Sequence, residues 1–306
     1  ATSEGGRIMP IDKRNDTEWH VPNGATHDAK EGELVEAVQE SGKRLGLPIA
    51  RIVARLGDPS GAKAVSLIAI HQHGIPDRFP TEVIAAATAA LPAPLGRRED
   101  LRDLPLVTID PSDARDHDDA VFAVVDEDPK NPGGFVLYVA IADVAHYVRP
   151  NSPLDREARS RGNSSYFPDR VVPMLPDALS GDLCSLHEGV DRACLVARMV
   201  IDASGAKISH RFLRALMRSP ASLHYEEVQE AFDGAPNSKC VPFLEAVIKP
   251  LYAAYACLGQ DRSRRQPLDL ELPERKIVLS DDGKVVSVDF KDRLDAHKLI
   301  EEFMIL

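Results

Sequence analysis

Five aspartates lie close together in the stretch TIDPSDARDHDDA, which runs from Thr108 to Ala120. They are Asp110, Asp113, Asp116, Asp118 and Asp119, and with one arginine among them the stretch carries a formal charge of −4. Carboxylates that are held close together repel, and one of them takes up a proton unless a cation intervenes. Such a density of aspartates indicates either a solvated acidic loop or a site for a cation.

Three interpretations of the acidic stretch can be compared. Most charge runs are solvated acidic loops. A calcium-binding EF-hand loop requires a glycine at its sixth position and a glutamate at its twelfth, and neither can be placed here. A magnesium site for phosphoryl chemistry fits the hard oxygen ligands, and four or more aspartates are enough for one or two ions. Composition alone leaves the acidic loop and the magnesium site both open.

The residues on either side of the aspartates favour the metal site. Leu104, Leu106, Val107 and Ile109 precede the cluster, and the apolar run 120–125 follows it. A loop between two buried strands keeps its tip near the core, where uncompensated charge is costly. A divalent cation would remove that cost.

The elements around the cluster follow from hydrophobic pattern. From residue 101 onward, two pairs of apolar segments predict hairpins, and segments with helical periodicity alternate with them. We expect hairpins from AVFAVV with GFVLYVAIADV and from CLVARMVID with AKISHRFLRALMRS, and helices in PTEVIAAATAAL, SPLDREARSRG, HYEEVQEAF, VPFLEAVIKPLYAAYACLGQDRSRRQ and DAHKLIEEFMIL.

The first 72 residues read as short strands that are separated by polar turns, which is typical of a small antiparallel barrel. In PIARIVARL, one alternating face is wholly apolar and the other carries Arg51 and Arg55. These arginines indicate either a solvated strand face or the phosphate-tracking face of an OB-type barrel, a fold that often binds single-stranded nucleic acid.

Length and composition are those of a globular chain. The 306 residues are enough for about two domains at ~150 residues each. The net charge of −11 does not resemble that of a generic nucleic-acid binder, although it leaves a local basic channel open. No apolar run approaches the ~18 residues of a membrane span, no signal-peptide core is present, and the four cysteines form no CxxC pair. We therefore expect a cytoplasmic protein with reduced thiols, no membrane partner and no disulfide-linked partner.

The stretch DLRDLPLVTIDPSDARDHDDAVFAV resembles the catalytic signature of the ribonuclease II/ribonuclease R family of exoribonucleases. The resemblance continues through LYVAIADVAHYVRPNSPLDREARSRGNSSYFPDRVVPMLPDALSGDLCSLHEGVDRACLV and reaches DAHKLIEEFMIL. Residues 1–72 are similar to part of the cold-shock-like OB domains that precede that catalytic domain. The resemblance implies an α+β chain with two parts: a partial OB-type β-barrel over 1–72, which binds RNA, and the N-terminal part of a larger mixed α/β catalytic domain over 73–306.

The resemblance also implies an activity and roles for the aspartates. Members of the family hydrolyse single-stranded RNA from its 3′ end to 5′-mononucleotides with Mg²⁺, and Mn²⁺ is an alternative ion. The catalytic set falls on Asp110, Asp116, Asp118 and Asp119, with Asp110, Asp116 and Asp119 at the metal. Loss of Asp118 is expected to harm the chemistry most. Asp113 and His117 fall at variable positions, and we interpret His117 as a spacer.

For the substrate, the resemblance places Tyr166 where an aromatic side chain stacks on the terminal nucleotide. A core tyrosine is the alternative interpretation. Leu270 falls where some members have a phenylalanine, so a two-sided aromatic clamp is not expected. We also expect a basic path for RNA, lined by Arg51, Arg55 and the three arginines of DRSRR (Arg262, Arg264 and Arg265).

The chain departs from the family pattern after EEFMIL, where the catalytic domain would continue through an arginine-rich segment. We therefore expect the remaining C-terminal part of that domain as a partner. The alternative function is a truncated or split RNA-binding fragment without catalytic competence.

Overall fold

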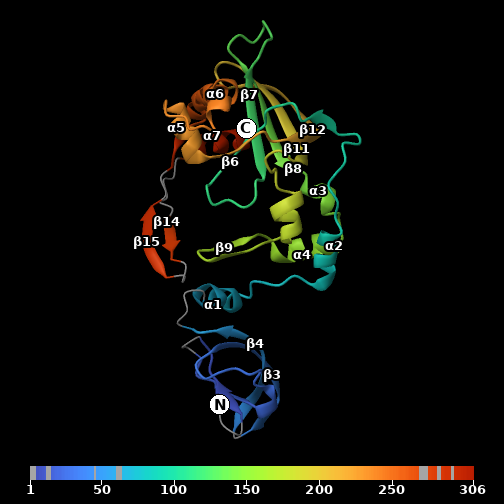
Figure 1. Ribbon diagram of the computed structural model, residues 1–306, viewed down its shortest axis with the longest axis vertical. Coiled ribbons are helices and arrows are strands. Elements are labelled where there is room, and N and C mark those ends of the chain that lie inside the picture. Colours follow the sequence, from blue (N-terminus) through green and yellow to red (C-terminus); the bar gives the residue numbers. More distant parts are fainter. Residues whose placement is uncertain are drawn as a thin grey trace. The chain divides into compact units, whose positions relative to one another are not determined.

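The computed structural model describes residues 5–11, 15–44, 46–59, 64–268, 275–280, 284–290 and 293–306. The chain forms two compact units (Figure 1). Unit 1 comprises residues 1–78, 164–172 and 274–290, and unit 2 comprises residues 79–163, 173–273 and 291–306. The fold class is α+β, as the sequence predicts.

Unit 1 is built mainly from strands. A four-stranded sheet has the order β1-β2-β4-β3, and two further pairs, β9–β10 and β14–β15, are antiparallel hairpins. The elements are β1 (Gly6–Ile8), β2 (Trp19–Val21), the 3₁₀ turn η1 (Asn23–Ala25), β3 (Leu34–Arg44), β4 (Leu47–Gly57), α1 (Ala64–Gln72), β9 (Ser165–Phe167), β10 (Arg170–Val172), β14 (Arg275–Leu279) and β15 (Val285–Phe290).

The alternation predicted for β4 is confirmed. Ala50 and Ile52 are buried, whereas Arg51 and Arg55 are exposed. Because successive side chains of a strand point to opposite faces, one face of β4 packs inward and the other carries the arginines.

The prediction that only strands fill the chain up to residue 72 is wrong. Residues 64–72 form helix α1, which buries Ala64, Ser66 and Ile70. Its alanines, leucine and glutamine favour a helix, and the hydroxyl of Ser66 donates a hydrogen bond to Asp169, which lies beside the β9–β10 hairpin. The helix is thus stabilised by a distant segment that local pattern does not reveal.

Unit 2 alternates strands with helices. Its elements are α2 (Thr81–Thr88), β5 (Glu99–Leu101), β6 (Thr108–Asp110), β7 (Asp119–Val125), β8 (Phe135–Ala142), α3 (Val144–Tyr147), α4 (Pro153–Arg161), the π-helical turn η2 (Ala178–Leu183), β11 (Asp191–Ile201), β12 (Lys207–Arg218), β13 (Ser222–His224), α5 (Tyr225–Phe232), the 3₁₀ turn η3 (Val241–Phe243), the π-helical turn η4 (Leu244–Ile248), α6 (Lys249–Arg265) and α7 (Asp295–Ile305). The predicted hairpins are β7–β8 and β11–β12, and the predicted helices correspond to α2, α4, α5, α6 and α7.

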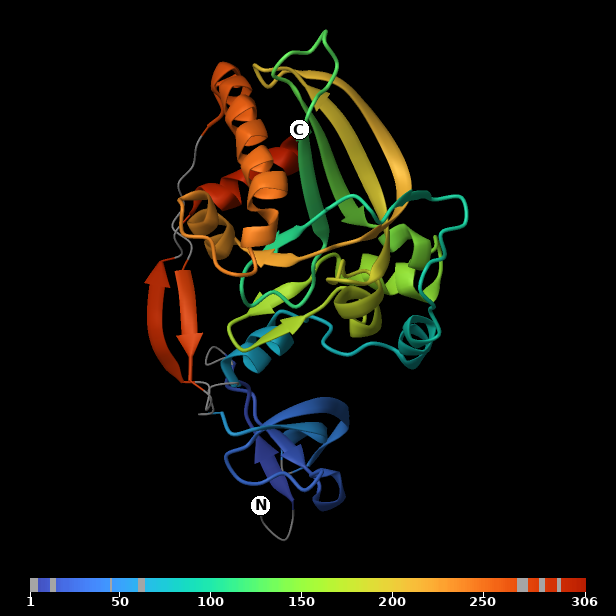
Figure 2. The same cartoon turned by 45° about the horizontal axis from the view of Figure 1, so that its top comes forward.

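The main sheet of unit 2 has the order β5-β12-β11-β8-β7. Only the β5–β12 pair is parallel. Helices α6 and α7 lie beside β7 on one side of this sheet (Figure 2). The core is formed between the two layers and includes Val121, Leu137, Leu251 and Phe303. The sheet therefore gives the start of β7, where the aspartate loop ends, a rigid support.

One helical stretch corrects the expectation from the sequence that no apolar segment reaches membrane length. Among the described residues, Val241–Arg265 is long and apolar enough to cross a membrane by length and composition. Leu251, Tyr252, Ala254 and Leu258 of this stretch are buried in the core of unit 2. One face of this helix therefore packs on the core of unit 2.

Candidate active site

The aspartate loop is closed at its base by neighbouring strands. Asp110 ends β6 and Asp119 begins β7. Just outside the loop, Val107 and Val121 exchange two backbone hydrogen bonds, with N···O distances of 3.1 and 2.9 Å. Strand β6 also pairs in parallel with β13, which places Asp110 opposite His224. The two ends of the loop are thereby brought together, as the apolar flanks predict.

Backbone contacts also fix the last part of the loop. The His117 N–H donates to Ser185 Oγ at 3.0 Å, and the Leu186 N–H donates to the His117 carbonyl at 2.8 Å. The Ala142 N–H donates to the Asp118 carbonyl at 2.9 Å. The aspartates near the end of the loop are therefore held against two other segments of unit 2.

Asp119 has the strongest electrostatic perturbation of the cluster. Burial raises its pKa to about 7, and the charges of Asp110 and Asp118 act in the same direction. Its Oδ2 is buried and has no hydrogen-bond partner among the described residues. An unpaired carboxylate oxygen in such a place either holds a proton or awaits a cation.

Asp118 differs from Asp119 because its side chain is exposed to solvent. The protein around it nevertheless removes part of its hydration, which raises its pKa, and the charges of Asp116 and Asp110 raise it further. Asp113 is exposed and Asp116 is half-buried. The members of the cluster thus interact electrostatically, although their exposure differs.

His117 makes a direct side-chain contact with one of the aspartates. Its Nδ1 lies 2.6 Å from Asp110 Oδ2, and the two side chains are largely buried. The hydrogen bond to Asp110 raises the pKa of His117, and burial opposes this shift. The interpretation of His117 as a spacer missed this contact, because nothing in the sequence shows which way the ring points.

The chemistry of the donor set suits a divalent metal ion such as Mg²⁺. The aspartates of the loop supply carboxylate oxygens, which are the ligands that Mg²⁺ prefers, and Asp119 Oδ2 is a buried acceptor without a partner among the described residues. In the part of the chain that the structure describes, however, no three potential ligands already converge on one point. The residues fit the ion by type and by electrostatic need, and binding would have to draw the carboxylates closer.

Two helix starts border the cluster, and neither is expected at the site from the sequence. Tyr225 at the start of α5 stacks on His297 of α7, with ring centroids 4.0 Å apart. Burial raises the pKa of Tyr225 to about 12, and the charges of Asp119 and Asp110 contribute to this rise. In the sequence, HYEEVQEAF and DAHKLIEEF show only helical periodicity, so this contact had no local signal.

The predicted nucleotide-stacking residues are not part of the acidic loop. Tyr166 belongs to unit 1, on β9, and is 72% exposed. This exposure excludes the alternative of a core tyrosine, and stacking on RNA stays a prediction. Leu270 lies outside the described residues.

The two arginines of β4 each pair with a carboxylate of unit 1. Arg51 Nε lies 3.1 Å from Glu40 Oε1. Arg55 forms a two-pronged contact with Glu33, at 2.8 and 2.5 Å, which lowers the pKa of Glu33 to about 2. Both guanidinium groups are exposed on the strand face, so RNA would have to compete with these pairs.

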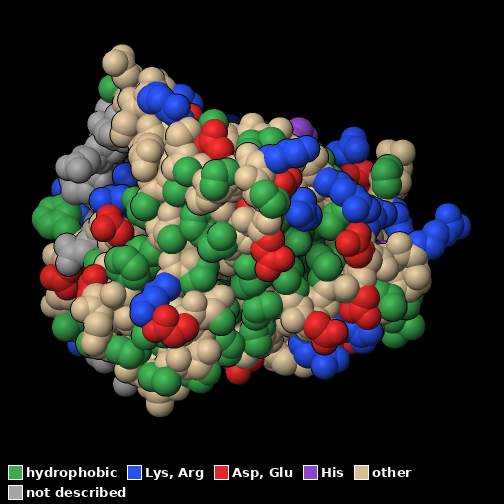
Figure 3. All heavy atoms as spheres, turned by 90° about the horizontal axis from the view of Figure 1, so that it is seen from above, with side chains coloured by type: hydrophobic (Ala, Val, Ile, Leu, Met, Phe, Trp, Pro, Cys, Tyr) green, Lys and Arg blue, Asp and Glu red, His purple; other side chains and the backbone are tan. Residues whose placement is uncertain are grey.

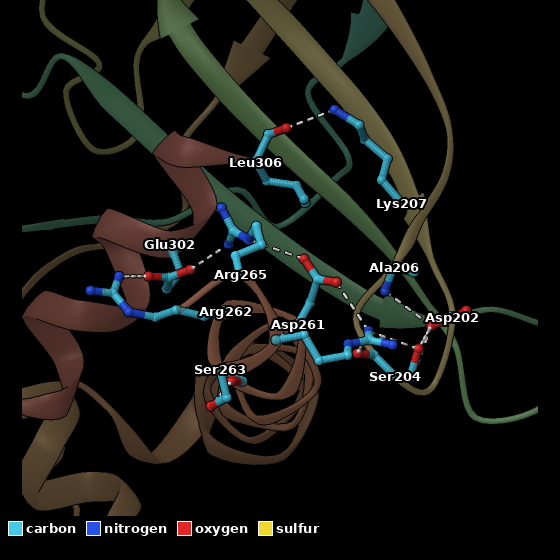
Figure 4. Close-up of polar contacts among 12 residues, drawn as sticks. Asp202, Ser204, Ala206, Lys207, Asp261, Arg262, Ser263, Arg265, Glu302 and Leu306 are labelled. Carbon is cyan, nitrogen blue, oxygen red and sulfur yellow. Dashed lines mark hydrogen bonds and ion pairs between the residues drawn. The ribbon is translucent and has the colours of Figure 1, made fainter. Parts of the chain in front are cut away.

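The arginines of DRSRR make internal contacts at the end of α6 (Figure 4). Arg262 and Arg265 both pair with Glu302 of α7, a carboxylate that is only 3% exposed. Arg264 donates to the carbonyl of Ser204 at 2.8 Å and pairs with Asp261. Seen from above, basic side chains gather toward the right of the face, and acidic ones lie among them (Figure 3). These three arginines are engaged within unit 2, and their place in a basic path for RNA stays a prediction.

Comparison with known proteins places this geometry in context. The RNB domain family matches residues 98–306, and the cold-shock domain family matches residues 8–80. Ribonuclease R from Vibrio cholerae is 40% identical over 309 residues, and the alignment covers 98% of this chain and 37% of the relative. Ribonuclease R from Escherichia coli is 40% identical over 310 residues, with the same coverage of both chains. The chain thus spans a little over a third of the length of these relatives.

A solved structure agrees with the sequence relatives. Mycoplasma genitalium RNase R in complex with double-stranded RNA is 26% identical, with a TM-score of 0.85. The similarity covers 94% of this chain and 52% of that chain. Because the RNB domain match alone includes well over half of the residues, the chain belongs to the RNB domain family and carries a cold-shock domain match in front of it.

Proposed function

We propose that the protein is a Mg²⁺-dependent 3′→5′ exoribonuclease that hydrolyses single-stranded RNA to 5′-mononucleotides. The observation that carries the proposal is the closed acidic loop, in which Asp119 has a pKa of about 7 and a buried oxygen that finds no hydrogen-bond partner in the described part of the chain. Membership of the RNB domain family supports the reaction class. Relatives named Ribonuclease R support RNA as the substrate.

We assign the metal-binding role to Asp110, Asp116 and Asp119. A divalent cation, when bound there, supplies charge neutralisation for the phosphate and lowers the pKa of a nearby water. Mg²⁺ suits the all-oxygen set, and Mn²⁺ would serve as a replacement. The fixed ends of the loop limit how far these carboxylates can separate. Part of the free energy that is needed to bring the like charges together is therefore supplied by folding.

Asp118 has a different role in this proposal. Its carboxylate is accessible to solvent, while its carbonyl is anchored to Ala142. An accessible carboxylate with a raised pKa can take up a proton during hydrolysis. We therefore assign to Asp118 the role of supporting the attacking water.

Substrate binding is assigned to side chains outside the loop. Exposed Tyr166 offers a ring face for the terminal base, since stacking on aromatics tolerates any sequence. Leu270 would pack against the same base, and Arg51 and Arg55 would contact phosphates. The same proposal assigns RNA binding to residues 1–72, as an OB domain, and catalysis to residues 73–306, as part of the catalytic domain. It also includes a cytoplasmic location.

The second candidate is an RNA-binding piece that lacks catalytic competence by itself. Two observations are consistent with it: no three ligands converge among the described residues, and the chain spans a little over a third of the relatives. In that case, the remaining part of the catalytic domain is the partner that completes the site.

The test uses two 5′-labelled RNA oligonucleotides, one with a free 3′ hydroxyl and one with a blocked 3′ end. The full-length protein and the 306-residue chain should be assayed side by side with Mg²⁺ or with a chelator. Progressive shortening of the unblocked RNA by the full-length protein, in the presence of Mg²⁺ only, supports the proposal. Internal cleavage, or equal activity in the chelator, would contradict it. Activity of the full-length protein only would favour the second candidate for the chain itself.

A further inference from the structure

The contact between His117 and Asp110 gives the acidic loop an internal partner of its own. His117 Nδ1 lies 2.6 Å from Asp110 Oδ2, and the side chains are 15% and 13% exposed. A neutral imidazole with its proton on Nδ1 donates this hydrogen bond, so the contact does not require a charged ring. One of the two oxygens of Asp110 is thus engaged by the protein.

Both the backbone and the ring of His117 are contacted by the segment 185–187. The backbone of His117 is bonded to Ser185 Oγ and to the Leu186 N–H. The carbonyl of Ser185 accepts a hydrogen bond from Arg192 Nε at 2.9 Å. The ring of His187 meets the His117 ring edge-on, with centroids 6.0 Å apart and an interplanar angle of 87°. Because these contacts restrict His117, its ring can in turn orient the carboxylate of Asp110.

The two outer aspartates of the site therefore differ. Asp110 is hydrogen-bonded through Oδ2. Asp119 has a buried Oδ2 without a partner in the described part of the chain. A ligand that is already oriented loses less side-chain freedom when an ion binds than one that is free to rotate.

We propose that His117 is a positioning residue, which holds Oδ2 of Asp110 so that Oδ1 is the single oxygen offered to the cation. This inference rests on the proposed metal-dependent function. Hydrogen bonds to metal ligands orient them, and their loss typically weakens metal binding by about 10- to 100-fold. Asp110 is then a one-oxygen ligand, and its contribution depends on the donor at position 117.

The experiment measures Mn²⁺ binding by calorimetry in the full-length protein without RNA. His117→Phe keeps an aromatic ring against His187 but removes the donor, whereas His117→Asn keeps an N–H near the position of Nδ1. His146→Phe is the matched control, because this half-buried histidine meets the Tyr147 ring edge-on and has no contact with the aspartates of the loop among the described interactions. We expect about tenfold weaker binding in His117→Phe, rescue to within about threefold in His117→Asn, and no change in His146→Phe.

The outcomes separate this inference from the function on which it rests. If the wild-type protein binds Mn²⁺ and His117→Phe binds it equally well, the positioning role is wrong and the proposed function stands. Equal losses in His117→Asn and His117→Phe would also overturn the role, because shape and not the donor would then matter. If the wild type shows no saturable site that Asp110→Asn abolishes, the proposed metal site and this inference both fail. Should His117→Phe not fold, the Nδ1 proton resonance decides the question, since its retention in Asp110→Ala, which has no side-chain acceptor, would overturn the inference.

Discussion

At the scale of single residues, the acidic loop combines one hydrogen-bonded carboxylate with one that is left without a partner among the described residues. The five aspartates left a solvated loop and a cation site both open, and their apolar flanks favoured the cation site, because repulsion among carboxylates near a core needs compensation. The contact of His117 with Asp110 and the stacking of Tyr225 on His297 could not be predicted. They depend on side-chain directions and on segments that are far apart in the sequence.

The first prediction concerns the pH dependence of stability in metal-free buffer. The folded-state pKa of Asp119 is raised from 3.8 to about 7, so the folded protein binds more protons than the unfolded chain between these values. Stability should therefore be greatest below about pH 4 with respect to this group, and should fall as the pH rises towards 7. The loss should amount to a few kcal/mol, since one pKa unit corresponds to about 1.4 kcal/mol.

Thermal unfolding in a chelator at several pH values measures this slope. Asp119→Asn should unfold at a temperature that depends less on pH, because the neutral amide cannot lose a proton. The raised pKa values of His117 and Asp118 act in the same direction, so some slope should remain. Identical slopes in the wild type and in Asp119→Asn would show that Asp119 is not held in a protonated state.

At the scale of elements, the hydrophobic pattern of the sequence predicted the hairpins and helices that contacts between neighbouring residues stabilise. The hairpins β7–β8 and β11–β12 were visible as paired apolar runs, and helix α4 as a run that follows a serine cap. The parallel β6–β13 pair joins residues more than a hundred positions apart, so no turn signal announces it. The hairpins of unit 1 that follow β4 in the sequence were missed, since exposed strands of three to six residues carry little pattern.

The turn between β11 and β12 supplies a prediction at this scale. Gly205 has φ +82°, and a Cβ there would lie 2.1 Å from the Cys257 carbonyl of α6. Gly205→Ala should therefore lower the free energy of unfolding by more than the ~1 kcal/mol that a left-handed conformation costs an alanine. Gly189 has φ +74° with open space around it and is the control. Equal losses in Gly205→Ala and Gly189→Ala, measured by urea unfolding, would mean that the turn does not pack on α6.

The contact between α6 and α7 leads to a second prediction at the scale of elements. Glu302 is buried and pairs with Arg262 and Arg265, so Arg262→Gln leaves this carboxylate with one cationic partner. We expect a loss of about 1–3 kcal/mol in unfolding free energy and an unchanged salt dependence of RNA binding. Exposed Arg97 is the control, since surface substitutions usually change stability by about 0.5 kcal/mol or less. A flatter salt dependence with unchanged stability would instead restore Arg262 to an RNA path.

At the scale of the whole molecule, the net charge of −11 has to be reconciled with the polyanionic substrate that we propose. In unit 1, Arg51 and Arg55 pair with carboxylates, and in unit 2, Arg262 and Arg265 of α6 pair with Glu302 of α7. Composition could not reveal this, because it counts charges without their partners. In the proposed function, RNA would therefore compete with carboxylates for Arg51 and Arg55.

The arginines of β4 test this view. If Arg51 and Arg55 each contact a phosphate, Arg51→Gln together with Arg55→Gln should flatten the plot of log K against log salt by about two units. Arg7→Gln, which removes an exposed pair with Glu18 in the same unit, should leave the slope unchanged. An equal slope in all three proteins would place the RNA path elsewhere.

The central claim is that the acidic loop performs chemistry on RNA and does not merely bind it. The direct test is Asp118→Asn in the full-length protein, with RNA affinity and mononucleotide release measured on one labelled oligonucleotide. A residue that acts in the transition state lowers turnover without weakening ground-state affinity. We predict unchanged affinity, almost complete loss of release, and an equal or higher unfolding temperature in metal-free buffer, because one repelling carboxylate is gone. If affinity falls together with release, Asp118 is a binding or folding residue, and if release survives, the loop is not the active centre.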